Sequence, residues 1–246
     1  MRYKIILSYD GTQFYGWQRQ KDKPTVQKAA EDALHKIYGR AVSVTGSGRT
    51  DEGVHAYGQA AHFDAPDRIE PQKLVSALNF YLPQTVRVLM CEPAPDGFHA
   101  RKSAQRKTYC YDMYYGTENP FLYGRALRLP DAADKDKMKA AAGVFVGKFD
   151  FSAFRCKGSG VQTTVRTVFE CAINELTLCQ SPALRLRVSA DGFLYKMARI
   201  IAGSLIRVGE GRLTADGLVA LLLSGAEWPQ KIPAEPGGLY LYSVEY

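Results

Sequence analysis

Long apolar runs are missing from this sequence of 246 residues. None of its apolar stretches approaches the roughly 18 consecutive residues that a membrane-spanning helix needs, so we expect no membrane insertion. Cysteine is scarce as well: the five cysteines include no Cys-x-x-Cys pair, which indicates neither a disulfide framework nor a zinc site. We also expect no leader segment. We therefore expect a cytoplasmic protein with reduced thiols and no bound metal.

Acidic residues are outnumbered, with 25 Asp and Glu against 32 Lys and Arg. The formal charge of +7 favours a polyanionic partner, although a merely solubilising surface would account for it as well. The distribution is more informative, because residues 97–111 and 151–169 contain basic residues and no acid. Aromatic residues lie among these cations, a mixture that follows a phosphate backbone and stacks bases, so we favour RNA as the partner. The residues that we expect to contact it are Arg101, Lys102, Arg106, Lys107 and Arg155.

Hydrophobic periodicity divides the chain into two α+β halves, residues 1–104 and 105–246. The first half has the order strand, helix, strand, strand, helix, strand, which is the split βαβ pattern of ferredoxin-like folds. The second half adds a long hairpin and two helices before its last strand. We expect strands over residues 3–9, 41–45, 57–63, 85–91, 107–115, 165–176, 184–190 and 239–244. We expect helices over residues 26–37, 71–81, 134–146, 197–208 and 215–223.

The most informative stretch is residues 46–56, which place the carboxylate of Asp51 close to the guanidinium of Arg49 in a loop with three glycines. Glycine lets a backbone turn sharply and approach a ligand closely, so the loop suits chemistry on a bound anion. A Walker-type phosphate loop is excluded, because Val54 and His55 follow the last glycine where Lys and Ser or Thr are needed. A dinucleotide-binding fingerprint fails too, since Asp51 occupies the position of its third glycine.

Two acids, Asp51 and Glu52, are neighbours in this loop. Neighbouring residues of an extended chain point to opposite sides, so these two cannot flank one glycosidic bond as paired carboxylates do. The plain alternative is a turn in which Asp51 hydrogen-bonds its own backbone. The loop residues alone leave Asp51 open as either a turn former or a reactive carboxylate.

Residues 48–56 resemble the catalytic loop of the TruA family of tRNA pseudouridine synthases. The core of that loop reads Gly-Arg-Thr-Asp-x-Gly-Val-His-Ala, and every fixed position matches. Further similar segments lie in the family's order, before the loop at residues 9–20 and after it at residues 106–111, 192–199 and 238–241. Glu52 stands where the family usually has alanine, and Lys196 where it often has histidine. His55 belongs to the matched loop without an assigned role, so we expect it to have a packing role.

The resemblance implies an α+β fold in which two ferredoxin-like halves form one continuous, mostly antiparallel sheet, with helices on one side and a central active-site cleft. It implies an isomerase that converts uridines 38, 39 and 40 in the anticodon stem-loop of tRNA to pseudouridine. The reaction breaks the N1–C1′ bond, turns the uracil and joins C5 to C1′. Nothing is added or lost, so no cofactor is expected. The family binds tRNA as a homodimer.

The resemblance also assigns roles to five residues. Asp51 corresponds to the catalytic carboxylate, which would attack C1′, steady an oxocarbenium-like species or remove a ribose proton. Arg199, on the basic face expected of its helix, corresponds to the arginine that pairs with this carboxylate. Tyr109 corresponds to the tyrosine that stacks on the target uracil. Arg49 corresponds to the arginine that helps to displace the target base, and Leu239 to the apolar residue that packs under the ring.

Two other functions stay open at this point. A synthase of the same chemistry could act on another RNA, and it would differ only in which uridines change. A non-catalytic RNA-binding protein would need the basic segments but not Asp51, so the intact loop argues against it.

Overall fold

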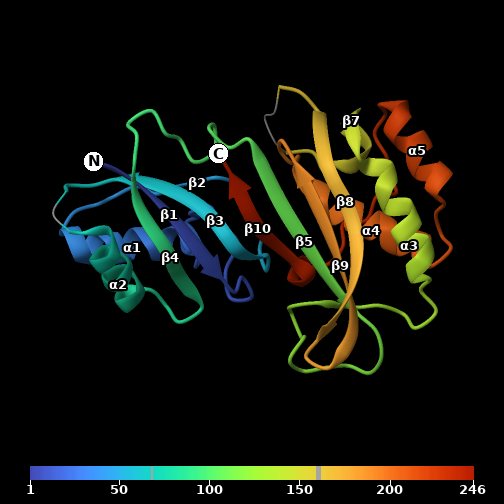
Figure 1. Cartoon of the computed structure of the whole chain (residues 1–246), viewed down its shortest axis with the longest axis horizontal. Helices are drawn as coiled ribbons and strands as arrows, with labels where there is room; N and C mark the ends of the chain where they lie inside the picture. The colour runs from blue at the N-terminus through green and yellow to red at the C-terminus, as the bar shows by residue number, and fades with distance from the viewer. Residues whose placement is uncertain (68, 159–161) are drawn as a thin grey trace. The chain divides into compact units, whose positions relative to one another are not determined.

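A computed structural model describes residues 1–67, 69–158 and 162–246 of the chain. The chain divides into two units, one made of Met1–Gln105 together with Tyr240–Tyr246, and the other of Arg106–Leu239. Each unit combines helices with parallel and antiparallel strand pairs (Figure 1), so the expected α+β class is confirmed. None of the described helices is long and apolar enough to cross a membrane.

The first unit has the expected order strand, helix, strand, strand, helix, strand, and the last strand of the chain joins it. Its elements are β1 (Arg2–Tyr9), α1 (Val26–Tyr38), β2 (Thr45–Gly46), β3 (His55–Asp64), α2 (Pro71–Tyr81), β4 (Val86–Ala94) and β10 (Leu239–Glu245). The strands lie in the order β4-β1-β3-β10, and β2 pairs with β3. β1 is antiparallel to both neighbours, whereas β10 runs parallel to β3.

Local sequence explains the first strand and helix. In β1 every second side chain is buried, from Tyr3 to Tyr9, as expected for a strand with one face on the core. Before α1, the side chain of Thr25 accepts a hydrogen bond from the N–H of Lys28, which is an N-cap. After it, Gly39 adopts the left-handed conformation that ends many helices.

The strand expected over residues 41–45 is wrong. Only Thr45 and Gly46 pair with β3, although Val42 and Val44 are buried as a strand pattern suggests. Side chains of α1 replace strand partners at this point. The N–H of Val44 donates to Oε1 of Glu31 over 3.1 Å, and its carbonyl accepts from Nε2 of Gln27 over 2.9 Å. Because these bonds satisfy the buried backbone, no neighbouring strand is needed.

The second unit is also an α+β structure. Its elements are β5 (Arg106–Tyr114), β6 (Leu127–Arg128), α3 (Lys135–Ala142), β7 (Gly147–Asp150), β8 (Val165–Leu178), β9 (Ser181–Ala190), α4 (Met197–Gly209) and α5 (Ala215–Ser224), with 3-10 turns at Gly143–Phe145, Ser152–Phe154 and Pro236–Gly238. The strands lie in the order β5-β9-β8-β7 and are antiparallel, while β6 runs parallel to β5. α3 contacts both α4 and β8.

The expected hairpin is confirmed as β8 and β9, which join at Cys179 and Gln180. Both residues have positive φ, 45° and 68°, as in the hairpin turns that match strand twist. The helix expected over residues 134–146 was too long. It ends at Ala142 and continues as one 3-10 turn from Gly143, where the low helix propensity of glycine favours a change of geometry.

Candidate active site

The loop that carries Asp51 lies between β2 and β3 and rests on residues 10–17. The N–H of Trp17 donates to the carbonyl of Thr50 over 3.1 Å, and that of Gly53 donates to the carbonyl of Phe14 over 3.3 Å. The two segments are thus joined backbone to backbone.

Glycine makes this close approach possible. A Cβ built on Gly11 would lie 2.0 Å from the carbonyl oxygen of Val54, and one on Gly16 would lie 2.4 Å from that of Thr50. Gly16 also has a φ of +80°, which side chains rarely tolerate. The Tyr9–Gln20 stretch noted in the sequence therefore acts as the support of the loop.

Asp51 is half-buried near the tip of the loop. The turn that follows is closed by the main chain, because the N–H of Val54 donates to the backbone oxygen of Asp51 over 3.2 Å. Gly53, with a φ of +76°, completes the turn. Main-chain atoms therefore close this turn.

A buried polar cluster lies under the loop and was not foreseen from the sequence. The hydroxyl of Tyr9 is 2.9 Å from Oγ1 of Thr50, and burial raises the pKa of Tyr9 well above its usual range. Gln59 accepts from Oγ of Ser47 over 2.7 Å and donates through Nε2 to the carbonyl of Gly48 over 2.9 Å. The cluster satisfies groups that would otherwise be costly to bury, and it keeps the loop in place.

His55 is 2% exposed and begins β3 directly after the loop. Its Nδ1 accepts the N–H of Gly11 over 3.0 Å. Its ring stacks on Tyr240 with centroids 4.7 Å apart, and Tyr240 in turn stacks on Tyr57 at 4.8 Å. These contacts agree with the packing role expected for His55.

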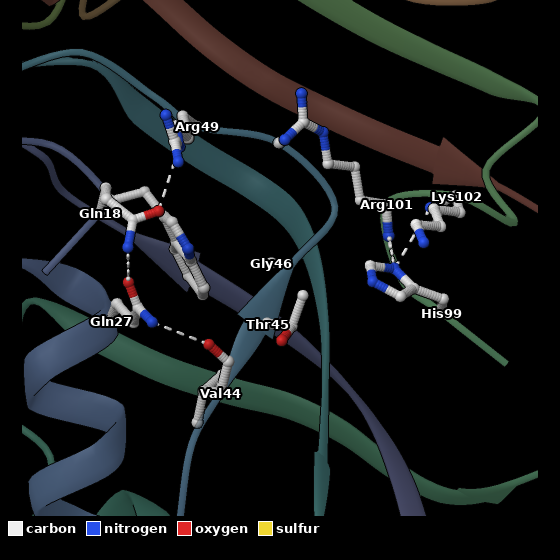
Figure 2. Close-up of a pocket in the computed structure, with 11 residues that line it drawn as sticks. Gln18, Gln27, Val44, Thr45, Gly46, Arg49, His99, Arg101 and Lys102 are labelled. Atoms are coloured by element: carbon white, nitrogen blue, oxygen red, sulfur yellow. Dashed lines mark hydrogen bonds between the residues drawn. The ribbon is translucent and has the colours of Figure 1, made fainter. Parts of the chain in front are cut away.

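Arg49 is exposed on the loop, and a chain of amide side chains holds it (Figure 2). Its Nε donates to Oε1 of Gln18 over 3.1 Å. Nε2 of Gln18 donates to Oε1 of Gln27 over 2.8 Å, and Nε2 of Gln27 reaches Oε1 of Glu31 at 3.1 Å. Glu31 is paired with Arg19 over 2.7 Å. Sequence reasoning missed this network, although Gln18 lies in a segment that resembles the family.

A pocket of about 490 Å³ lies beside Arg49 within the first unit (Figure 2). Arg101 and Lys102 line it, so the structure brings these two expected RNA contacts together with Arg49. The other lining residues are Trp17, Gln18, Gln27, Val44, Thr45, Gly46, Gly48 and His99.

Three expected site residues belong to the second unit. Tyr109 lies on β5, is 8% exposed and meets the ring of Phe193 edge to face at 4.8 Å. Arg199 lies in the first turn of α4, where its Nε donates to the carbonyl of Ala234 over 2.8 Å. Leu239 is the first residue of β10 and is 6% exposed.

The basic face expected of α4 is largely covered. A Cβ on Gly203 would lie 2.2 Å from the carbonyl oxygen of Ile232, and Arg207 donates to the carbonyl of Gln230 over 2.9 Å. The helical spacing correctly placed Gly203 and Arg207 on one face, but the segment after α5 packs on that face. This face is therefore not a free cationic surface.

The remaining basic residues differ in their surroundings. The guanidinium of Arg106 lies 4.5 Å from the ring centre of Phe169, a cation–π contact. Lys107 follows it on β5, and Arg155 is half-buried after the turn Ser152–Phe154. Lys157 is paired with Glu227 over 3.0 Å, so the segment 151–169 is less unbalanced in space than in sequence. Residues 159–161 of that segment lie outside the described residues.

Metal ligands do not gather in the described part of the chain. Within residues 1–67, 69–158 and 162–246, no three His, Cys, Asp or Glu side chains are placed to hold one ion. The described cysteines are free thiols, and burial raises the pKa of Cys91 and Cys110 to about 11.

Comparison with known proteins gives a consistent result. A family model described as tRNA pseudouridine synthase matches residues 5–101 and 141–246. A protein of Methylacidiphilum infernorum named tRNA pseudouridine synthase A is 44% identical over 246 residues, covering 99% of this chain and 95% of that protein. A protein of the same name from Rhodopseudomonas palustris is 40% identical, covering 100% of this chain and 99% of that one.

A solved structure, of an unknown protein from Galdieria sulphuraria, was also matched. It has 12% identity and a TM-score of 0.23, and the match covers 86% of this chain and 94% of that one. A likeness this weak carries no argument.

Proposed function

The chain belongs to the tRNA pseudouridine synthase family, and from that premise we propose that it modifies uridines 38, 39 and 40 in the anticodon stem-loop of tRNA. It is an isomerase that converts uridine in tRNA to pseudouridine.

The observation that carries the proposal is the braced loop around Asp51. Residues 10–17 and the cluster around Gln59 hold its backbone, and a main-chain hydrogen bond closes its turn. Breaking the N1–C1′ bond puts positive character on C1′. A fixed carboxylate at that position stabilises the charge without having to reorganise. The three roles of Asp51 considered above, nucleophile, stabiliser and base, all need this placement.

Four other residues complete the proposed site. Tyr109 stacks on the target uracil, and its edge contact with Phe193 supports a fixed ring plane. Arg199 pairs with Asp51, and its bond to Ala234 restrains the guanidinium. Leu239 packs under the ring. Arg49 fills the space that the displaced base leaves, as base-flipping enzymes require. The isomerisation adds and removes no atoms, so no cofactor or metal takes part.

The proposed assembly follows the family resemblance. Two ferredoxin-like halves, residues 1–104 and 105–246, continue as one mostly antiparallel sheet with helices on one side and the site in a central cleft. The strand and helix order of the first unit supports the ferredoxin-like pattern of the first half. The protein acts in the cytoplasm as a homodimer, and tRNA contacts Arg101, Lys102, Arg106, Lys107 and Arg155.

The test is to map pseudouridine in tRNA treated with the purified protein, and in tRNA from cells that lack it. We expect uridines 38, 39 and 40 to be converted in the first case and to stay unmodified in the second. Conversion confined to other positions or to another RNA would overturn the assignment of the target. Tight tRNA binding without any conversion would favour the non-catalytic alternative.

A further inference from the structure

The pocket beside the catalytic loop has a strongly one-sided lining. Arg49, Arg101 and Lys102 line it, and none of the lining residues is acidic. Arg49 enters from the catalytic loop, while Arg101 and Lys102 come from the connection between β4 and β5 (Figure 2). Cations from separate segments around one hollow create a positive potential that an anion would relieve.

The polar atoms of these three cations that remain available are all donors. Within the part of the chain that the structure describes, Arg49 uses only its Nε, on Gln18. The side chains of Arg101 and Lys102 make no hydrogen bond or ion pair there, since only their backbone N–H groups are engaged. Guanidinium and ammonium groups cannot accept hydrogen bonds. The pocket is thus prepared for an acceptor with several lone pairs.

The segment that carries Arg101 and Lys102 is fixed by two histidine rings. Nδ1 of His99 accepts the N–H groups of both residues, over 3.2 Å and 3.3 Å. Nδ1 of His62 accepts the N–H of Ala100 over 3.1 Å. Because the backbone is already ordered, binding an anion costs only the ordering of the two side chains.

The walls of the pocket favour a phosphate over a base. Trp17 is 2% exposed, and its indole is packed so tightly on Gly46 that a Cβ there would lie 2.5 Å from the ring. It therefore offers no free face for stacking. The amide groups of Gln18 and Gln27 bond to each other and to Arg49 and Val44, so they are already used and do not read a base edge.

We propose that this pocket binds one phosphodiester of the substrate RNA, within one or two nucleotides of the target uridine. Arg49 and Asp51 are two residues apart, so at most about 7 Å of chain separates them. A phosphate held by Arg49, Arg101 and Lys102 would then belong to a nucleotide near the target ribose rather than to a distant part of the RNA. The site fixes the strand beside the target. This inference rests on the proposed function, because Asp51 defines where the target lies.

The test uses synthetic anticodon stem-loops in which one phosphate near the target uridine is replaced by a neutral methylphosphonate. Binding is measured for the two phosphates on each side of the target. With the wild-type protein, we expect one position to cost about tenfold or more in affinity, as the loss of a charged hydrogen-bonded contact would. In the Arg101→Ala/Lys102→Ala protein, the cost at that position should fall to about twofold, whereas costs at the other positions should persist.

Two control proteins make the result specific. Arg40→Ala removes an exposed cation from the same unit. It should leave the loss of affinity caused by methylphosphonate unchanged at all four positions. Arg101→Lys/Lys102→Arg keeps both charges and should retain most of the cost at the sensitive position. The proposal would be overturned if methylphosphonate lowered RNA affinity equally in the wild-type and the Arg101→Ala/Lys102→Ala proteins at every position.

A second measurement separates RNA phosphate from a free anion. Inorganic phosphate is added at constant ionic strength, and we expect RNA affinity to change by less than twofold. Displacement of RNA by millimolar phosphate, without any sensitive methylphosphonate position, would assign the pocket to a free anion and overturn the proposal. Pseudouridine formation on the unmodified RNA is followed in parallel, so that failure of the proposed function is seen separately from failure of this site.

Discussion

The N–H of Gly11 donates to Nδ1 of His55 over 3.0 Å, in a buried contact that joins the end of β1 to the start of β3. Gly11 lies at the start of the segment that supports the loop of Asp51, and His55 directly follows that loop. Gly11 also touches Val54 so closely that no side chain fits between them. The imidazole thus serves as the acceptor that lets this glycine backbone be buried.

We expect His55→Ala to lower the free energy of unfolding by roughly 2–4 kcal/mol. It leaves the buried N–H of Gly11 without an acceptor and opens a cavity against Tyr240. Chemical denaturation followed by circular dichroism measures the change. His35→Ala is the control, because His35 is exposed on α1 and its loss should cost about 0.5 kcal/mol or less. Equal stability of the two variants would contradict the role of His55 as a support.

Gly16 offers a second test of the loop support. Gly16→Ala puts a Cβ 2.4 Å from the carbonyl of Thr50 at a φ of +80°, so the loop has to move and turnover should fall by about a hundredfold. Gly39 has a similar φ of +67°, but a Cβ built on it would have no atom within 4 Å. Gly39→Ala should therefore cost roughly 1 kcal/mol of stability and leave turnover unchanged. The pair separates backbone strain from displacement of the loop. Equal turnover in both variants would show that the contact with Thr50 is dispensable.

Much of the framework could be predicted from the sequence, because it depends on local patterns. Alternation predicted β1, helical spacing predicted α1, and two long alternating segments predicted the hairpin of β8 and β9. The strand expected over residues 41–45 failed because Glu31 and Gln27 bond the backbone of Val44, and such contacts between distant residues leave no periodic signal. The amide chain from Gln18 to Arg49 was missed for the same reason.

Gln18 should act as a positioning residue for Arg49. We expect Gln18→Leu to lower the single-turnover rate by about tenfold, because a misoriented guanidinium no longer fills the space that the displaced base leaves. The affinity for tRNA should change by less than threefold. Gln18→Glu keeps an acceptor for Nε of Arg49 and should recover most of the rate. Gln20→Leu is the control, because the side chain of Gln20 donates to the carbonyl of Tyr15 at an exposed site. A loss of affinity equal to the loss of rate would point to a general binding defect instead.

Tyr109 can be tested without disturbing its packing. Tyr109→Phe keeps the edge contact with Phe193, so tight RNA binding should survive. Most turnover should be lost if the hydroxyl moves a proton during the reaction. Tyr109→Leu should lose at least as much. Tyr111→Phe is the control on the same strand, since its hydroxyl donates to the carbonyl of Glu235 over 2.8 Å, and its loss should cost roughly 1 kcal/mol of stability only. If Tyr109→Phe had wild-type turnover, the hydroxyl would have no chemical role, and Tyr109 would serve only to stack on the uracil.

Asp51 is the centre of the proposed chemistry, and its neighbour supplies a matched control. We expect Asp51→Asn to abolish pseudouridine formation and to leave tRNA affinity within a few-fold of wild type, because affinity comes mainly from phosphate contacts that the change does not touch. Glu52→Gln removes the same charge from the next, exposed residue and should keep most of the activity. Single-turnover conversion with saturating enzyme measures the rate, and thermal melting confirms that both variants fold.

The size of the effect distinguishes the two explanations of Asp51 that the sequence left open. Asparagine has nearly the shape of aspartate and can still bond a nearby backbone, so a turn-forming residue would tolerate it at a cost of roughly 1 kcal/mol or less. The turn is in any case closed by the backbone oxygen of Asp51. A catalytic carboxylate would not tolerate the change, because asparagine carries no charge to steady C1′ and cannot act as a nucleophile or base. Substantial turnover in a well-folded Asp51→Asn protein would therefore remove Asp51 from the mechanism, whereas a loss of several orders of magnitude, absent in Glu52→Gln, would assign the chemistry to this carboxylate.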